Sequence, residues 1–229
     1  MNFTQIIDKL SASQQEADKG VEELDKELEN ILNHPAPPYY EKSYWDERYT
    51  RDPTPYEWYQ PFSRIKPLIE QYLTSEASAV SVGCGNSSLN AEILECGLNK
   101  VVGIDVSDVV IKQMQQLYAD ESRLEWIIAD CTAIPLPDAS FDFVFDKGTL
   151  DSLNSSLQTV PQATQMLTEI CRILKPGGLF FEVTYGTPNT RVPLITTASS
   201  QWELIETKEI EKPVDPGTFH YLYIFKKSG

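Results

Sequence analysis

The 229-residue sequence has little of what marks several special classes of protein. It contains four cysteines and two histidines, and no two cysteines have the C-x-x-C spacing of a zinc site, so no metal site is predicted. We expect reduced thiols in a cytoplasmic protein, with the nucleus as an alternative. No stretch approaches the roughly 18 apolar residues of a membrane span. The N-terminal segment lacks the apolar core of a secretory signal and carries acids where a mitochondrial presequence would carry arginine.

Basic residues are also scarce. The chain has 19 Lys and Arg against 34 Asp and Glu, which gives a formal net charge of −15 at pH 7. Such a field disfavours direct binding to nucleic acid and favours a basic partner. Hydrophobic residues make up 41% and charged residues 23%, which are ordinary values for a globular protein with one sizeable core. We expect no association with a membrane.

The chain divides into two parts of different pattern. Residues 1–33 carry a narrow apolar stripe at helical spacing, typical either of a partner-docking helix or of an appendage. The proline-rich stretch 34–38 ends that helix. We therefore predict a helical N-terminal extension and linker over residues 1–35 and the main domain over residues 36–229. This domain opens on an aromatic-rich stretch, 39–62, which is typical of core or of a lid over a site.

Beyond residue 62, helical and strand patterns alternate. This alternation predicts a doubly wound, mainly parallel α/β sheet. The predicted helices cover 63–73, 89–95, 107–118 and 161–174, and the predicted strands cover 79–82, 100–104, 124–129, 141–145 and 178–183. Two last strands, 202–207 and 219–226, have no helix between them and should pair antiparallel.

A glycine turn, Gly83-Cys84-Gly85, follows the first predicted strand and precedes a helix. Glycine lets the backbone turn tightly and approach a ligand closely. Asp105 ends the next strand, where a carboxylate accepts hydrogen bonds from ribose hydroxyls. The alternative is that Asp105 only caps the helix that begins near Ser107.

The third predicted strand ends in a second acid, Asp130. Its carboxylate can accept a hydrogen bond from an adenine amino group, while the amide of Cys131 donates to a ring nitrogen. The third glycine of a dinucleotide fingerprint is replaced by Ser88. The pattern therefore favours adenosine without phosphates, and S-adenosylmethionine as the ligand.

The fourth predicted strand runs into the sequence Asp146-Lys-Gly-Thr-Leu-Asp151. Asp146 and Lys147 fall at the carboxyl edge of the sheet, where open sheets bind their ligands. Asp146 or Asp151 could hold an incoming ammonium group, or either could cap the loop. The sequence Leu-Lys-Pro-Gly-Gly at 174–178 predicts a turn from a long helix into the fifth strand.

Together these features resemble a class I, seven-strand S-adenosylmethionine-dependent methyltransferase. The resemblance implies a Rossmann-like seven-stranded sheet with a terminal antiparallel pair, so that residues 36–229 would be the methyltransferase domain. A narrower similarity, covering about 40–227, is to the protein-lysine methyltransferases that act on translation elongation factor 1-alpha. It rests on the blocks YWDERY (44–49), YEW (56–58), GCGNS (83–87), DKGTLD (146–151) and FHYLY (219–223). A sibling that acts on mitochondrial citrate synthase has an import presequence; because we expect none here, citrate synthase is not the expected substrate.

The resemblance also implies which residues contact the cofactor. Three aromatic rings would close over the cationic sulfonium, which aromatic faces attract, although plain core packing is the alternative for each. The implied cofactor residues are Trp45, Tyr49, Trp58, Gly83, Gly85, Asp105, Val106, Asp130, Cys131 and Lys147. The candidate catalytic residues are Asp146, Lys147 and Asp151.

The resulting hypothesis is a protein-lysine methyltransferase that uses S-adenosylmethionine. Its expected substrate is a folded basic protein, with elongation factor 1-alpha as the leading candidate. A small-molecule methyltransferase on the same fold is the first alternative and would enclose its acceptor in a pocket. A non-catalytic adenosyl-binding partner protein is the second.

Overall fold

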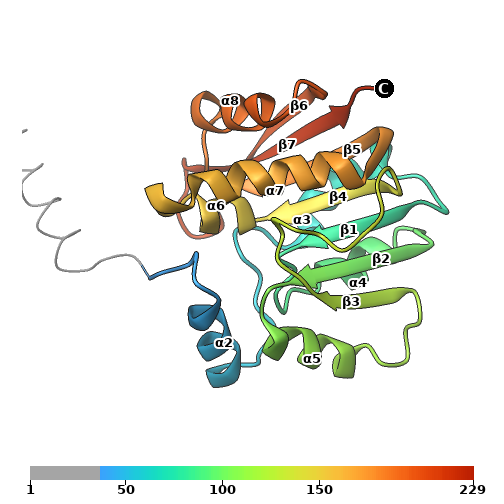
Figure 1. Cartoon of the computed structure of the whole chain (residues 1–229), viewed down its shortest axis with the longest axis vertical. Coiled ribbons are helices and arrows are strands. Elements are labelled where there is room, and N and C mark those ends of the chain that lie inside the picture. Colours follow the sequence, from blue (N-terminus) through green and yellow to red (C-terminus); the bar gives the residue numbers. More distant parts are fainter. Residues whose placement is uncertain (1–36) are drawn as a thin grey trace, which may run out of the picture. The chain divides into compact units, whose positions relative to one another are not determined.

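The computed structural model describes residues 37–229, and Figure 1 shows their arrangement. Residues 39–229 form one compact unit. The helix and linker predicted for residues 1–35 lie outside the described residues. Within the described part of the chain, no helix combines the length and the apolar run that a membrane crossing requires.

One seven-stranded sheet forms the centre of this unit, with the strand order β3-β2-β1-β4-β5-β7-β6. The strands are β1 (Ser78–Val82), β2 (Lys100–Asp105), β3 (Leu124–Ile128), β4 (Phe141–Lys147), β5 (Leu174–Thr184), β6 (Trp202–Glu211) and β7 (Phe219–Lys227). β1 to β5 are parallel, and β7 runs antiparallel to β5 and to β6. The predicted doubly wound sheet and its terminal antiparallel pair are confirmed.

Helices cover both faces of the sheet (Figure 1). They are α2 (Lys42–Arg51), α3 (Phe62–Ile69), α4 (Leu89–Leu94), α5 (Asp108–Leu117), α6 (Thr149–Leu153), α7 (Val160–Ile173) and α8 (Pro188–Ala198), with 3-10 turns η1 (Glu70–Tyr72) and η2 (Leu157–Thr159). α3, α4 and α5 pack on one face, and α6, α7 and α8 pack on the other. Successive strand residues such as Val101 and Val102 therefore enter different cores, because neighbouring strand side chains point to opposite faces.

Local sequence signals explain several element boundaries. Ser107 is the predicted N-cap of α5, and its hydroxyl accepts the Val110 N–H. The turn predicted at 174–178 is wrong in part, because β5 already begins at Leu174, opposite Phe141. The register then shifts, so that Phe143 pairs with Leu179 and the intervening residues form an irregularity in the strand.

The parallel strands β1 to β4 all point toward the side on which α2 lies (Figure 1). The strand order reverses between β1 and β4, and open α/β sheets bind ligands at the carboxyl ends of the strands beside such a reversal. The loops that follow β1, β2, β3 and β4 contain the residues that the sequence singled out.

Candidate cofactor and acceptor site

The glycine turn after β1 is held directly by Asp105 at the end of β2. Gly83 and Gly85 have φ angles of +55° and +52°, which other residues adopt only with strain. The N–H of Gly85 donates to one oxygen of Asp105 at 3.0 Å, and the N–H of Ser107 donates to the other at 2.9 Å. Each oxygen keeps a lone pair for a ligand, so Asp105 can fix the turn and accept hydrogen bonds from ribose hydroxyls as well.

The carboxyl group of Asp105 is buried, and the residue as a whole is 7% exposed. Burial raises the pKa of Asp105 to about 6, against the opposing effect of the N–H donors of Ser107 and Gly85. The group is therefore mostly ionised at pH 7, as an acceptor for two hydroxyl donors should be.

Three predicted aromatic rings gather beside this turn. Trp45 and Tyr49 of α2 stack with ring centroids 5.9 Å apart at 26°, and Trp58 stands edge-on to Trp45 at 5.9 Å. Tyr49 is buried, and a Cβ on Gly85 would lie 2.8 Å from its hydroxyl oxygen. Asp46 joins α2 to the start of α5 by accepting the Ser107 hydroxyl at 2.6 Å. Tyr49 thus lies at the glycine turn, Trp45 packs on Tyr49, and Trp58 packs on Trp45. Contact of the three rings with a cofactor stays a prediction.

The end of β3 lies next to the end of β2. The N–H of Ala129 donates to the carbonyl of Asp105 at 2.9 Å. Asp130 is exposed, and its Oδ1 accepts from the N–H of Thr132 at 2.8 Å and from its hydroxyl at 2.7 Å. These hydrogen bonds leave Oδ2 for a ligand. Cys131 and Val106 are half-buried beside it, so all four predicted adenosine contacts lie at neighbouring strand ends.

Glu57 is a site residue that the sequence analysis missed. Its carboxylate accepts from the N–H of Ser88 at 2.7 Å and from the hydroxyl of Ser87 at 2.8 Å, at the start of α4. It also pairs with Lys147 at 2.6 Å. Lys147 Nζ donates in addition to the carbonyl of Trp58 at 3.1 Å. The only signal for Glu57 in the sequence is its place between two aromatic residues in the block YEW.

Burial and the ion pair with Glu57 act in opposite directions on the pKa of Lys147. Its side chain is almost fully buried. Burial lowers the pKa of the Lys147 ammonium, and the Glu57 carboxylate opposes that shift. Burial would raise the pKa of Glu57, but Lys147 and the serine donors lower it overall. Lys147 therefore fastens the aromatic segment to β4, and its predicted catalytic role stays a prediction.

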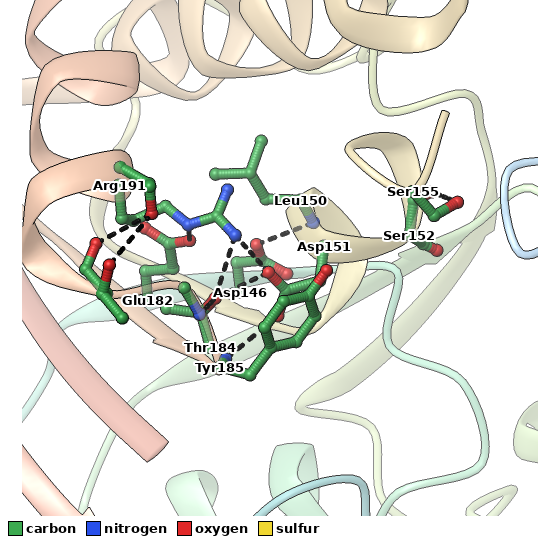
Figure 2. A network of polar contacts seen from close by, with 12 residues as sticks. Asp146, Leu150, Asp151, Ser152, Ser155, Glu182, Thr184, Tyr185 and Arg191 are labelled. Carbon is green, nitrogen blue, oxygen red and sulfur yellow. Dashed lines mark hydrogen bonds and ion pairs between the residues drawn. The ribbon is translucent and has the colours of Figure 1, made fainter. Parts of the chain in front are cut away.

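The two predicted catalytic acids belong to a buried polar cluster between β4, β5, α6 and α8. Figure 2 shows Asp146, Asp151, Glu182 and Arg191 together. Asp151 pairs with Arg191 and accepts the Thr184 hydroxyl at 2.6 Å. Arg191 Nε lies 3.1 Å from Glu182 Oε1, but this contact lacks hydrogen-bond geometry. Burial raises the pKa of Glu182 well above its usual range, so this acid favours its neutral form.

Asp146 caps α6 from outside the helix. Its oxygens accept from the N–H groups of Thr149 at 2.8 Å and Leu150 at 3.0 Å. The residue is 1% exposed, and burial raises the pKa of its carboxyl to about 6 despite these donors. Asp146 and Asp151 thus both have partners inside the protein. A role for either in holding a substrate ammonium stays a prediction.

Replacing Asp146 should remove part of the pH dependence of stability. Its folded pKa lies about 2 units above the unfolded value, so the native protein should lose about 3 kcal/mol as the pH rises from about 4 to about 6. Asp146→Asn has no carboxyl group to ionise, so it cannot lose this stability. Urea unfolding across that range should therefore show the native free energy of unfolding falling relative to the variant. The exposed Asp120→Asn is the control and should follow the native curve. Parallel native and Asp146→Asn curves would contradict the assignment.

The residues fit S-adenosylmethionine. Its adenosine carries hydroxyl and amino donors, which match the carboxylates of Asp105 and Asp130. Its sulfonium is a cation, which matches the aromatic rings of Trp45 and Trp58. The turn admits only glycine at its first position, since a Cβ on Gly83 would meet the side chain of Thr149 at 2.0 Å. The donor and acceptor types of the site thus match those of the molecule.

The sequence is similar to a known protein family and to individual proteins of that family. Residues 80–181 match the family described as "Methyltransferase domain". EEF1A lysine methyltransferase 4 of Mus musculus is 36% identical over 179 residues, which are 74% of this chain and 70% of that protein. The protein of the same name from Bos taurus is 37% identical over 72% of this chain and 69% of its own length.

A longer relative and a solved structure add to this. The eEF1A lysine and N-terminal methyltransferase of Bos taurus is 34% identical over 66% of this chain but only 22% of its own length. The crystal structure of the N-methyltransferase NodS from Bradyrhizobium japonicum, in complex with S-adenosylhomocysteine, superposes with a TM-score of 0.59 at 16% identity. That match covers 73% of this chain and 85% of NodS, and it establishes the shared fold.

Proposed function

Because this chain belongs to the family of S-adenosylmethionine-dependent protein-lysine methyltransferases, we propose that its substrate is a lysine of translation elongation factor 1-alpha. The single observation that carries the proposal is the 36% identity to a relative named for that substrate, over 70% of the relative's length. The net charge of −15 supports it, since such a field favours encounter with a lysine-rich surface. A cytoplasmic location, where translation takes place, is part of the same proposal.

The bound cofactor supplies an electrophilic methyl group on a sulfonium. Asp105 and Asp130 would hold its adenosine, and the glycine turn would let it lie close to the backbone. Positioning is a large part of what a protein can contribute to such a displacement, which needs an in-line approach. Glu57 and Lys147 hold the aromatic-rich stretch, 39–62, against the glycine turn and β4.

The acceptor lysine has to lose a proton before it reacts. With a pKa near 10.4, keeping the amine neutral at pH 7 costs about 4.6 kcal/mol. Burial among aromatic side chains lowers the pKa of a lysine and offsets much of that cost. After its proton has passed to water, the neutral nitrogen would be the nucleophile for the methyl group that the bound cofactor would supply.

Mass spectrometry of purified elongation factor 1-alpha tests the proposal directly. Incubation with the enzyme and S-adenosylmethionine should add the mass of a methylene group to a lysine-containing peptide. Omitting the enzyme, or replacing it by the Asp105→Ala variant, should leave the peptide unchanged or methylated far more slowly. If no lysine of the factor gains mass, while a small metabolite becomes methylated when the enzyme is added to a cell extract, the protein substrate is wrong.

A further inference from the structure

The carboxyl ends of the strands divide the site into two parts. Asp105 ends β2, Asp130 lies two residues beyond β3, and Gly83 follows β1, so the predicted adenosine contacts lie on that side of the sheet. The strand order continues from β1 to β4 and β5. The carboxyl ends of these two strands therefore remain for the methyl acceptor. Gly148 follows β4, and Tyr185 follows β5.

A second tyrosine, Tyr59, faces the end of β4 from an unusual backbone conformation. Its φ angle is +61°, and the N–H of Gln60 donates to the carbonyl of Trp58 at 2.7 Å, so Tyr59 is the centre of a three-residue turn. Contacts on both sides fix this turn. Lys147 Nζ donates to the carbonyl of Trp58 at 3.1 Å, and Gln60 Nε2 donates to the carbonyl of Glu211 at 2.9 Å.

The identity of the residue at this turn needs an explanation. Glycine would adopt the left-handed conformation without strain, whereas a bulky aromatic residue is an outlier there. Strained backbone of this kind clusters at active sites and ligand-binding segments. The Tyr59 ring lies against the backbone after β4, because a Cβ on Gly148 would be 3.1 Å from its Cε2 atom.

Tyr185 provides a second ring on the same side. Its residue is 51% exposed, and its ring centroid lies 6.2 Å from that of Tyr59 at 77°. The ring of His220 lies behind Tyr59, with centroids 4.7 Å apart. Burial and then the neighbouring Asp151 carboxylate raise the pKa of both phenols, so both rings stay neutral at pH 7.

We propose that Tyr59 and Tyr185 form the two walls of the site that receives the acceptor lysine. The exposed Tyr185 ring would attract the incoming ammonium through its π face. The half-buried Tyr59 ring would then cover one side of the amine at the end of β4 and exclude water from it. Loss of water favours the neutral, reactive form of the amine. This inference rests on the proposed function, because it assigns the substrate side chain of that same reaction.

Steady-state methylation of elongation factor 1-alpha by the full-length enzyme tests the assignment. Tyr185→Leu and Tyr59→Leu should each lower kcat/KM about 10-fold, whereas Tyr185→Phe, which keeps the ring, should stay within about 3-fold of the native value. Affinity for S-adenosylhomocysteine, measured by calorimetry, should stay unchanged in all three. The matched control is Tyr72→Leu, because Tyr72 bonds Glu206 at 2.8 Å and packs beside Phe181, away from the strand ends.

The outcomes separate this proposal from the proposed function. If the native enzyme methylates the factor but both leucine variants keep the native kcat/KM, the rings do not form the acceptor site. The same holds if cofactor affinity falls in step with activity, because the rings would then belong to the cofactor part. If the native enzyme adds no methyl group to any lysine of the factor, the proposed function fails and the acceptor assignment fails with it.

Discussion

Asp105→Ala should weaken binding of S-adenosylhomocysteine by about 30- to 150-fold. The variant removes the acceptor for two ribose hydroxyls and leaves their desolvation uncompensated, which costs on the order of 2–3 kcal/mol. It also releases the N–H of Gly85, which Asp105 accepts at 3.0 Å, so the turn that faces the ligand loses its anchor. Titration calorimetry on variants that melt at the native temperature measures the effect.

The affinity for S-adenosylhomocysteine should also depend on pH. The pKa of Asp105 is about 6, and the ionised form is the better acceptor. Affinity of the native protein should therefore fall as the pH drops below 6, approaching a 10-fold loss per pH unit, while that of Asp105→Ala should stay flat. The exposed Asp108→Ala, three residues along the chain, is the control and should bind like the native protein. Equal affinities for native protein and Asp105→Ala would exclude the ribose assignment.

Arg191→Met should lower the free energy of unfolding by about 3–5 kcal/mol at pH 7. Arg191 is 3% exposed and lies between Asp151 and Glu182, with Nε 3.1 Å from Glu182 Oε1. Removing one partner of a buried ion pair leaves an uncompensated charge in a medium that solvates it poorly. Urea unfolding at pH 7 measures the loss.

A surface arginine supplies the comparison. Arg123 is 51% exposed and pairs with Glu121, so Arg123→Met should cost no more than about 1 kcal/mol. Arg191→Lys keeps the positive charge but loses the planar guanidinium group. Its free energy of unfolding should lie between those of the native protein and Arg191→Met. A loss at Arg191→Met no larger than at Arg123→Met would show that the buried cluster contributes little to stability.

Local signals made part of the site predictable. The glycine turn, Asp105 and the Ser107 cap all lie within one strand–turn–helix–strand unit, where short-range stereochemistry decides the structure. The doubly wound sheet followed from alternating strand and helix patterns, the terminal antiparallel pair followed from two strands with no helix between them, and both were confirmed. The position of Asp130 beside Asp105 needed only the rule that successive parallel strands end at the same edge.

Long-range partners made the rest unpredictable. Glu57 reaches Lys147 across 90 residues of sequence, and no periodicity encodes such a pair. α8 escaped prediction because its threonines and the internal Pro193 disfavour a helix. It forms where Arg191 pairs with the buried acids and Ile195 enters the core, so tertiary contacts override local propensity. The left-handed turn at Tyr59 is likewise imposed by contacts of its neighbours.

The contacts of Glu57 hold one segment of the chain to two loops at the candidate site. The segment around it is fastened to the β1–α4 turn through Ser87 and Ser88 and to β4 through Lys147, and Asn86 adds a hydrogen bond to the carbonyl of Thr54 at 2.7 Å. If Trp45, Tyr49 and Trp58 cover the cofactor as predicted, these contacts would have to open whenever the cofactor is exchanged. The rate of that opening would then set an upper limit on turnover.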